Sequence, residues 1–211
     1  MTSSIGQLCI NVTDLERSIA FYTGLGLECT SRTEIPQALE AIVEHAGGTG
    51  GKIQLAQQKE PVDPFDLGTA LGPLTVHTRD PGEGSGRDPD GYLIELVEAQ
   101  ADAPWVGPFG INVTDVGATV AFYERLGLDC TGRVVGGQLL LTARDDGPIR
   151  MGSLWKLYVN TDDLEALHAK AVAAGHVSLV EPMRLDRWPV TISFLADPDG
   201  YQVELVQRHP D

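Results

Sequence analysis

The sequence contains few basic residues. It has 15 Lys and Arg against 30 Asp and Glu, a formal charge of −15 with His neutral, and no run of basic residues. Nucleic acids and anionic membrane surfaces both attract clustered Lys and Arg. The composition therefore argues against nucleic acid and against a membrane as partners. The acidity itself mainly favours solubility and does not indicate a cationic substrate.

Long apolar runs and paired cysteines are also missing. No stretch of about 20 apolar residues occurs, and residues 1–6 lack the basic and apolar regions of a signal peptide. The three cysteines, Cys9, Cys29 and Cys130, form no Cys-x-x-Cys pair, which argues against a disulfide framework or a zinc site. We therefore expect a cytoplasmic protein with reduced thiols.

What the sequence does contain is an internal repeat. Residues 10–14 recur at 111–115, and residues 20–30 recur with few changes at 121–131. A second block, residues 88–97, returns at 197–206. The repeat predicts two domains, 1–100 and 105–211, joined by the small, Pro-containing stretch 101–104.

Each domain opens with the same pattern of elements. Alternating apolar residues predict a strand that ends at Thr-Asp, a suitable helix N-cap, and helices are predicted over 15–25 and 116–126. The second domain repeats the pattern with a strand over 155–159, a helix over 163–174, and strands over 177–180, 190–195 and 201–206. The matching part of the first domain has only residues 79–87 available, with one Pro and three Gly. We predict that this quarter of the chain lacks its helix and one strand.

The two motif blocks together resemble the vicinal oxygen chelate superfamily, which contains glyoxalase I, bleomycin-resistance proteins, fosfomycin-resistance enzymes and extradiol dioxygenases. The blocks run from Val12 to Leu27 and from Asp88 to Leu96, and the resemblance covers nearly the whole chain in two copies. It implies an α+β fold of tandem paired βαβββ modules that form cupped mixed sheets, with a truncated second module in the first domain. It also implies that a small organic molecule is bound in a cup.

The resemblance further implies where a metal would bind, because metal-dependent members of the family place ligands on the first and last strands of each module. By position, the first cup offers Gln7, Gln54 and Glu95 as a candidate set for one divalent metal. The second cup offers Glu204, because Pro108 and Leu154 have no coordinating side chain. The alternative is that neither cup binds a metal.

Alternation along the strands identifies residues that face the second cup. Lys156 and Tyr158 share one face of their strand, and we expect Lys156 beside Glu204 because the first and last strands of a module are neighbours. An ammonium there would neutralise a buried carboxylate where relatives place a metal cation. Asn112, and Asn11 at the equivalent position in the first domain, are further candidate ligand contacts.

Several residues carry two interpretations. His77 could be a catalytic base or a strand-end histidine near the surface, and Trp188 could stack on a flat ligand or pack within a loop. Glu95 and Glu204 are candidate catalytic carboxylates or ordinary strand residues beside a turn.

Two functions follow, and the sequence does not decide between them. The first is a metal-assisted lyase, isomerase or dioxygenase that acts on a small organic metabolite. The second is a metal-free protein that binds a small molecule or drug and acts by sequestration, with one domain as a degenerate structural partner. Both imply a small-molecule ligand, and a homodimer is left open.

Overall fold

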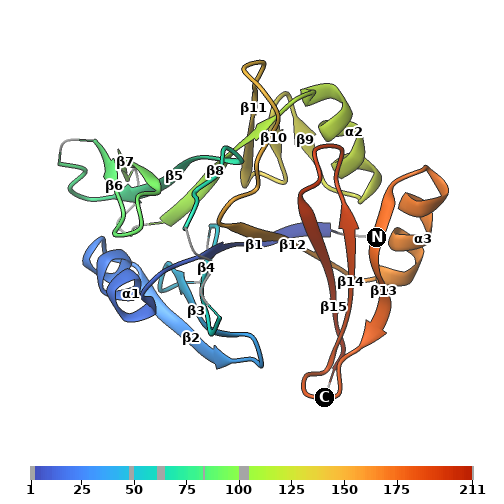
Figure 1. Cartoon of the computed structure of the whole chain (residues 1–211), viewed down its shortest axis with the longest axis horizontal. Helices are drawn as coiled ribbons and strands as arrows, with labels where there is room; N and C mark the ends of the chain where they lie inside the picture. The colour runs from blue at the N-terminus through green and yellow to red at the C-terminus, as the bar shows by residue number, and fades with distance from the viewer. Residues whose placement is uncertain (1–2, 48–49, 61–64, 83, 100–104, 211) are drawn as a thin grey trace.

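The computed structural model describes residues 3–47, 50–60, 65–82, 84–99 and 105–210; the predicted linker 101–104 lies outside these ranges. The described residues form two mixed sheets with helices on the outside (Figure 1).

The first quarter of the chain holds β1 (Ser3–Asn11), α1 (Leu15–Gly24), β2 (Glu28–Glu34), β3 (Ala38–Glu44) and β4 (Ile53–Gln58). The second holds β5 (Leu71–Thr78), β6 (Ser85–Arg87) and β7 (Leu93–Glu98). The third holds β8 (Trp105–Val113), α2 (Val116–Arg125), β9 (Cys130–Thr131), β10 (Val134–Val135) and β11 (Leu139–Ala143). The fourth holds β12 (Leu154–Thr161), α3 (Leu164–Ala173), β13 (Val177–Arg184), β14 (Val190–Ala196) and β15 (Gln202–Arg208).

The sheets combine the four quarters in a way that differs from our expectation. We expected each repeat to form a cup of its own. Instead, the eight-stranded sheet has the order β13-β14-β15-β12-β1-β4-β3-β2 and joins the fourth quarter to the first. The seven-stranded sheet, β6-β7-β5-β8-β11-β10-β9, joins the second to the third. The antiparallel pairs β1–β12 and β5–β8 make these joins, so residues of the two repeats share each sheet.

The helices form where the sequence predicts them. Asp14, Asp115 and Asp163 are the N-caps, and each side chain accepts a hydrogen bond from a backbone N–H in the first turn. Residues 71–82 and 84–98 contain three strands and no helix, which confirms the truncated second quarter. No helix in the described part of the chain is long and apolar enough to cross a membrane.

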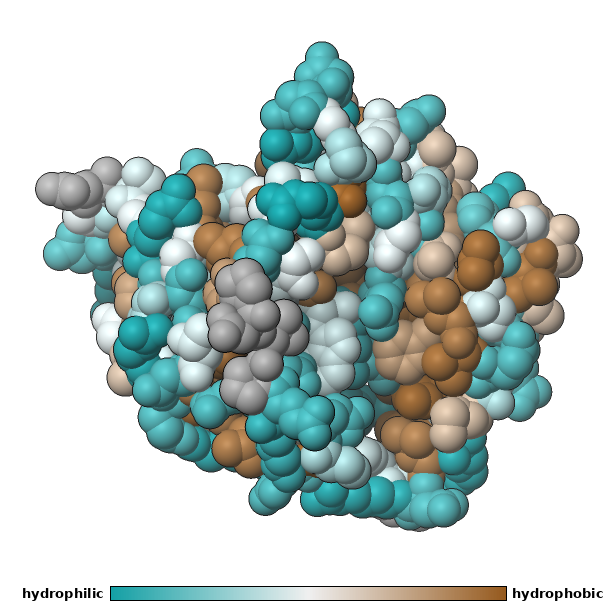
Figure 2. All heavy atoms as spheres, viewed as in Figure 1, coloured by the Kyte–Doolittle hydropathy of each residue, from teal (hydrophilic) through white to brown (hydrophobic). Residues whose placement is uncertain are grey.

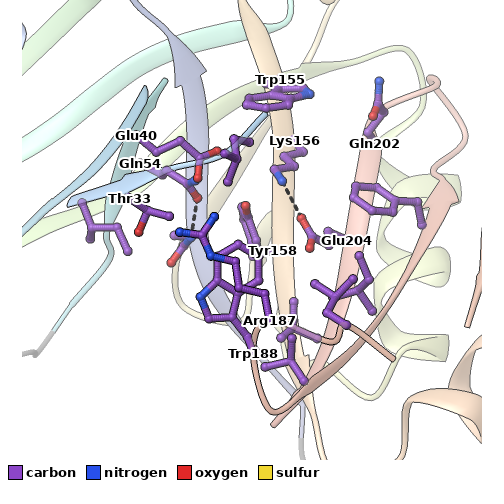
Figure 3. Close-up of a pocket in the computed structure, with 18 of the residues that line it drawn as sticks. Thr33, Glu40, Gln54, Trp155, Lys156, Tyr158, Arg187, Trp188, Gln202 and Glu204 are labelled. Carbon is purple, nitrogen blue, oxygen red and sulfur yellow. Dashed lines mark hydrogen bonds and ion pairs between the residues drawn. The ribbon is translucent and has the colours of Figure 1, made fainter. Parts of the chain in front are cut away.

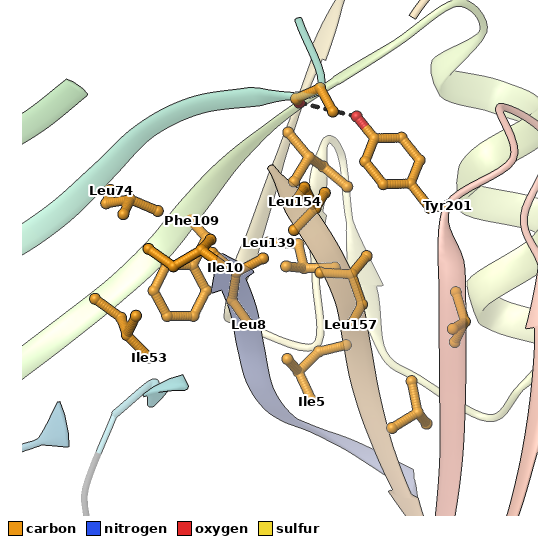
Figure 4. Close-up of a cluster of buried hydrophobic side chains, with 14 of the residues drawn as sticks. Ile5, Leu8, Ile10, Ile53, Leu74, Phe109, Leu139, Leu154, Leu157 and Tyr201 are labelled. Carbon is orange, nitrogen blue, oxygen red and sulfur yellow. Dashed lines mark hydrogen bonds between the residues drawn. The ribbon is translucent and has the colours of Figure 1, made fainter. Parts of the chain in front are cut away.

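The hydrophobic core lies between the two sheets (Figure 4). Leu8 and Ile10 of β1 and Leu157 of β12 meet Phe109 of β8 and Leu139 of β11, and all five side chains are fully buried. Alternation along a strand sends every second side chain to the opposite face. One face of the eight-stranded sheet is therefore fixed against the core, and the other is left to form a cup.

The two repeated motif blocks contact each other within each repeat. The hydroxyl of Thr13 donates to Asp90, and the hydroxyl of Tyr92 donates to the backbone oxygen of Asn11 at 2.6 Å. The equivalent pairs in the second repeat are Thr114 with Asp199 and Tyr201 with Asn112. These hydrogen bonds attach the turn before the last strand of each repeat to the end of that repeat's first strand.

One equivalent pair differs between the repeats and gives a testable prediction. The buried hydroxyl of Tyr22 donates to Asp88 Oδ2 at 3.1 Å, whereas Tyr123, at the matching position near Asp197, is buried without a hydrogen-bond partner among the described residues. Tyr22→Phe should lower the free energy of unfolding by about 1–3 kcal/mol, because it removes a hydrogen bond to a carboxylate. Tyr123→Phe, the matched control, should change it by less than about 0.5 kcal/mol. Urea unfolding of both variants measures the difference, and equal losses would contradict the assignment.

Candidate functional site

The candidate site is a cavity of about 860 Å³ on the concave face of the eight-stranded sheet. Residues of the first and fourth quarters line it, including the β2–β3 turn and the segment between β13 and β14. Figure 2 shows hydrophobic residues gathered over β13 to β15, where Val190, Ile192, Phe194 and Val206 line the wall. The volume lies within the range of about 300–1,000 Å³ that is typical of small-molecule sites.

Alternate side chains of β12 and β15 form the floor of the cup. Lys156 and Tyr158 point into the cavity from β12, and Glu204 points in from the parallel strand β15, where it is opposite Tyr158. The sequence placed Leu154 on the same face, but Leu154 is buried in the core cluster and Trp155 lines the cavity instead. The register between β1 and β12 shifts at this point, and such an irregularity reverses the alternation.

Lys156 and Glu204 form an ion pair at the floor (Figure 3). Lys156 Nζ lies 2.8 Å from Glu204 Oε2, and their side chains are 11% and 7% exposed. The sequence predicted this pairing. Burial raises the pKa of the Glu204 carboxyl, and the charge and hydrogen bond of Lys156 oppose that rise. The rings of Trp155, Tyr158 and Phe194 lie 4.7, 4.8 and 5.6 Å from the ammonium, close enough for cation–π attraction.

The first quarter contributes the facing polar groups. Gln7 Nε2 donates to Gln54 Oε1 at 2.5 Å, so each amide of β1 and β4 already has a partner in the other. Glu40 of β3 also lines the cavity, and its Oε1 is buried without a hydrogen-bond partner among the described residues. Burial raises the pKa of the Glu40 carboxyl, with Lys156 acting in the opposite direction. The cup therefore contains one buried carboxyl with a counter-ion and one without.

Comparison with known proteins identifies the family of this chain. The family model for the glyoxalase/bleomycin resistance protein/dioxygenase superfamily matches the sequence at residues 4–67 and 105–205, which is more than half of the chain. The chain belongs to this superfamily. A lactoylglutathione lyase of Arabidopsis thaliana is 26% identical over 146 residues, which are 54% of this chain and 50% of that protein. The aligned region therefore spans about half the length of the curated relative.

Solved structures of the superfamily share the fold. Glyoxalase I from Zea mays superposes with a TM-score of 0.80 at 20% identity, with 98% of this chain and 92% of that chain covered. A putative dioxygenase from Bacillus subtilis gives a TM-score of 0.73 at 15% identity, with 98% and 86% covered. At these identities the likeness establishes the architecture of paired modules and cupped sheets, and it does not transfer an activity.

Membership in the superfamily implies a divalent metal as a candidate cofactor, but the residues in the cup do not fit one. The described residues contain no group of three or more His, Cys, Asp or Glu side chains arranged around a common point. At the floor, Gln7 and Gln54 bind each other, and the ammonium of Lys156 neutralises Glu204. A divalent metal needs about three to four free N or O donors, and an adjacent ammonium would repel it.

The structure separates the proposed metal ligands. Gln7 and Gln54 lie in the eight-stranded sheet, whereas Glu95 is an exposed residue of β7 in the other sheet and accepts a hydrogen bond from Thr75 at 3.3 Å. The three residues do not form one ligand set, because the first quarter shares its sheet with the fourth quarter and not with the second. His77 is also on the seven-stranded sheet, where its ring stacks on Trp105 with a centroid distance of 3.7 Å.

The two asparagines lie outside the 860 Å³ cavity. Asn112 donates to the backbone oxygen of Thr69 at 2.8 Å, and Asn11 accepts from Gln58 at 2.6 Å. Each side chain therefore already has a hydrogen-bond partner, at the end of the first strand of its repeat. Trp188, by contrast, lines the cavity together with Lys156, Tyr158 and Glu204.

Sequence reasoning missed two charged residues that line the cup, Glu40 and Arg208. Glu40 is a single acidic residue between apolar positions of β3, a pattern that could have suggested a buried carboxyl. Arg208 follows Glu204 and Val206 at a spacing of two on β15, so alternation could have placed it on the cup face.

Proposed function

We propose that this protein binds a small organic molecule in the cup between its first and fourth quarters and that it does so without a divalent metal. The observation that carries the proposal is the ion pair between Lys156 and Glu204, which provides the buried carboxylate with a counter-ion from the chain itself. Concave, mostly apolar surfaces with a few polar anchors are typical of such binding sites. The walls supply the apolar surface, and the floor supplies the anchors.

A neutral aromatic probe tests the proposal directly. N-phenyl-1-naphthylamine should bind saturably, with one probe per chain and a dissociation constant on the order of micromolar, because its rings fit an apolar cavity of this size. Fluorescence titration after treatment with EDTA and after addition of excess Zn²⁺ should give the same constant. Binding that disappears with the chelator would contradict a metal-free site.

Two variants locate the probe. Ile192→Asp places a charge on the apolar wall of the cup and should weaken binding about tenfold or more. Leu140→Asp makes the same chemical change at an exposed leucine of β11 in the other sheet and should leave the dissociation constant unchanged. Equal effects of the two changes would place the probe outside the cup.

A second candidate function is metal-free proton transfer, and Glu40 is the residue that favours it. A carboxyl whose pKa is raised by burial can exchange a proton closer to neutral pH than an exposed one can. Glu40 lines a cavity that could hold a reacting group, and its Oε1 is buried without a hydrogen-bond partner among the described residues. With S-lactoylglutathione in D₂O as the trial substrate, this function predicts that the natural protein removes the proton on the carbon next to the thioester carbonyl and returns a deuteron from solvent. Glu40→Gln should lose this exchange and should still bind the naphthylamine probe.

The raised pKa of Glu40 also makes the free energy of unfolding depend on pH. Because its pKa is higher in the folded state, the folded protein holds the proton more tightly, and this contribution is present below about pH 4.5 and lost as the pH rises through the raised pKa. Glu40→Gln should therefore reduce the decline in the free energy of unfolding between pH 4.5 and 7.5. Glu16→Gln is the control with the opposite sign and a lower pH range: Arg32 lowers the pKa of Glu16, so its contribution is present above about pH 4.5 and lost as the pH falls below that value. An unchanged slope in Glu40→Gln would show that this carboxyl titrates as an exposed one.

A further inference from the structure

The cup is polar at both ends and mostly apolar in the middle. Three neighbouring strands, β12, β15 and β14, each send alternate side chains into it. The residues are Lys156, Tyr158 and Asn160 on β12, Gln202, Glu204, Val206 and Arg208 on β15, and Val190, Ile192 and Phe194 on β14. Along β15, the side chains that face the cup are, in order, an amide, the ion-paired carboxylate, an apolar residue and an arginine.

Both arginines of the lining lie at the same end of the cup. Arg208 pairs with Val190 across β14 and β15, and the next residue, His209, donates its backbone N–H to Pro189 at 2.8 Å. Arg187 and Trp188 come directly before this point in the chain. The Arg187 guanidinium lies 4.9 Å from the centre of the Trp188 ring and donates to the backbone oxygen of Glu34 at 2.8 Å. This holds Arg187 over the cavity (Figure 3).

Among the residues that the structure describes, these arginines are the cations of the lining that form no ion pair with a carboxylate. The five charged residues that line the cavity are Glu40, Lys156, Arg187, Glu204 and Arg208. Lys156 is neutralised by Glu204, and among the described residues no ion pair involves Arg187 or Arg208. The nearby carboxylate of Glu34 pairs with Lys59. A protein with a net charge of −15 therefore presents, at one end of its cavity, two guanidinium groups that form no ion pair with the described residues.

The distance between the two ends sets the length of a matching ligand. Glu204 and Arg208 are four residues apart on one strand, which is about 13 Å between their Cα atoms. Between them lies Val206, with Ile192 and Asn160 opposite it on the two neighbouring strands. A ligand that contacts both ends needs a flat or elongated apolar body about 10 Å long.

We propose that the ligand is an amphipathic organic anion. Its carboxylate, sulfonate or phosphate group contacts Arg187 and Arg208, its aromatic or alicyclic body lies on the apolar walls, and a small polar group meets Glu40 and the ion pair. Guanidinium groups form strong charge-assisted hydrogen bonds with such anions. This inference rests on the proposed function, because it assigns a ligand class to the same cup.

Two probes with the same ring system test the assignment. 8-Anilinonaphthalene-1-sulfonate differs from N-phenyl-1-naphthylamine by one sulfonate group. The sulfonate probe should bind about tenfold tighter at low ionic strength, and its advantage should shrink as salt screens the arginines. Equal affinities, or tighter binding of the neutral probe, would overturn the anion assignment and leave the proposed function intact. If neither probe binds, the proposed function fails and the assignment fails with it.

Arginine variants decide whether the two guanidinium groups cause the preference. Arg187→Gln and Arg208→Gln should each weaken the sulfonate probe about fivefold and leave the neutral probe within about twofold. Arg184→Gln removes the same charge from β13, beside the cup but outside its lining, and should affect neither probe. If Arg184→Gln weakens the sulfonate probe as much as the other two, the effect is one of net charge, and direct contact with Arg187 and Arg208 is rejected. Arg208→Gln keeps the test valid if the loss of the Arg187 hydrogen bond to Glu34 disturbs the loop.

Discussion

The ion pair between Lys156 and Glu204 is the interaction on which the cup depends. A carboxylate buried without a partner costs several kcal/mol, and the ammonium offsets that cost at 2.8 Å. Three aromatic rings surround the ammonium and restrict it to the floor of the cavity. Because the chain supplies its own cation here, the rest of the cavity can be apolar and needs few other charges.

This interaction also depends on how the four quarters combine. Lys156 and Glu204 come from the fourth quarter, while Gln7, Gln54 and Glu40 come from the first, so the site requires both ends of the chain. The pairing of β1 with β12 brings these groups onto one sheet. The truncated second quarter belongs to the other sheet, away from the cup. The loss of a helix and a strand there therefore leaves the candidate site complete.

Local features were predictable from the sequence, and long-range pairing was not. The Asp N-caps and apolar spacing predicted the helices, and alternation predicted the contact between Lys156 and Glu204, because β12 and β15 are neighbours within one quarter. The repeat cannot tell which quarters share a sheet, since either combination buries the same apolar faces. The irregularity at Trp155 also depends on the partner strand, so alternation alone misplaced Leu154.

A double-mutant cycle on the ion pair is the most direct measurement of its role. Urea unfolding of Lys156→Met should show a loss of about 3–5 kcal/mol, because a carboxylate is left buried without a counter-ion. Lys156→Met combined with Glu204→Leu should recover most of that loss, because an apolar pair of similar volume replaces the charges. Additive losses from the two single changes, with a coupling energy near zero, would contradict the view that the ammonium and the carboxylate stabilise each other in the cup.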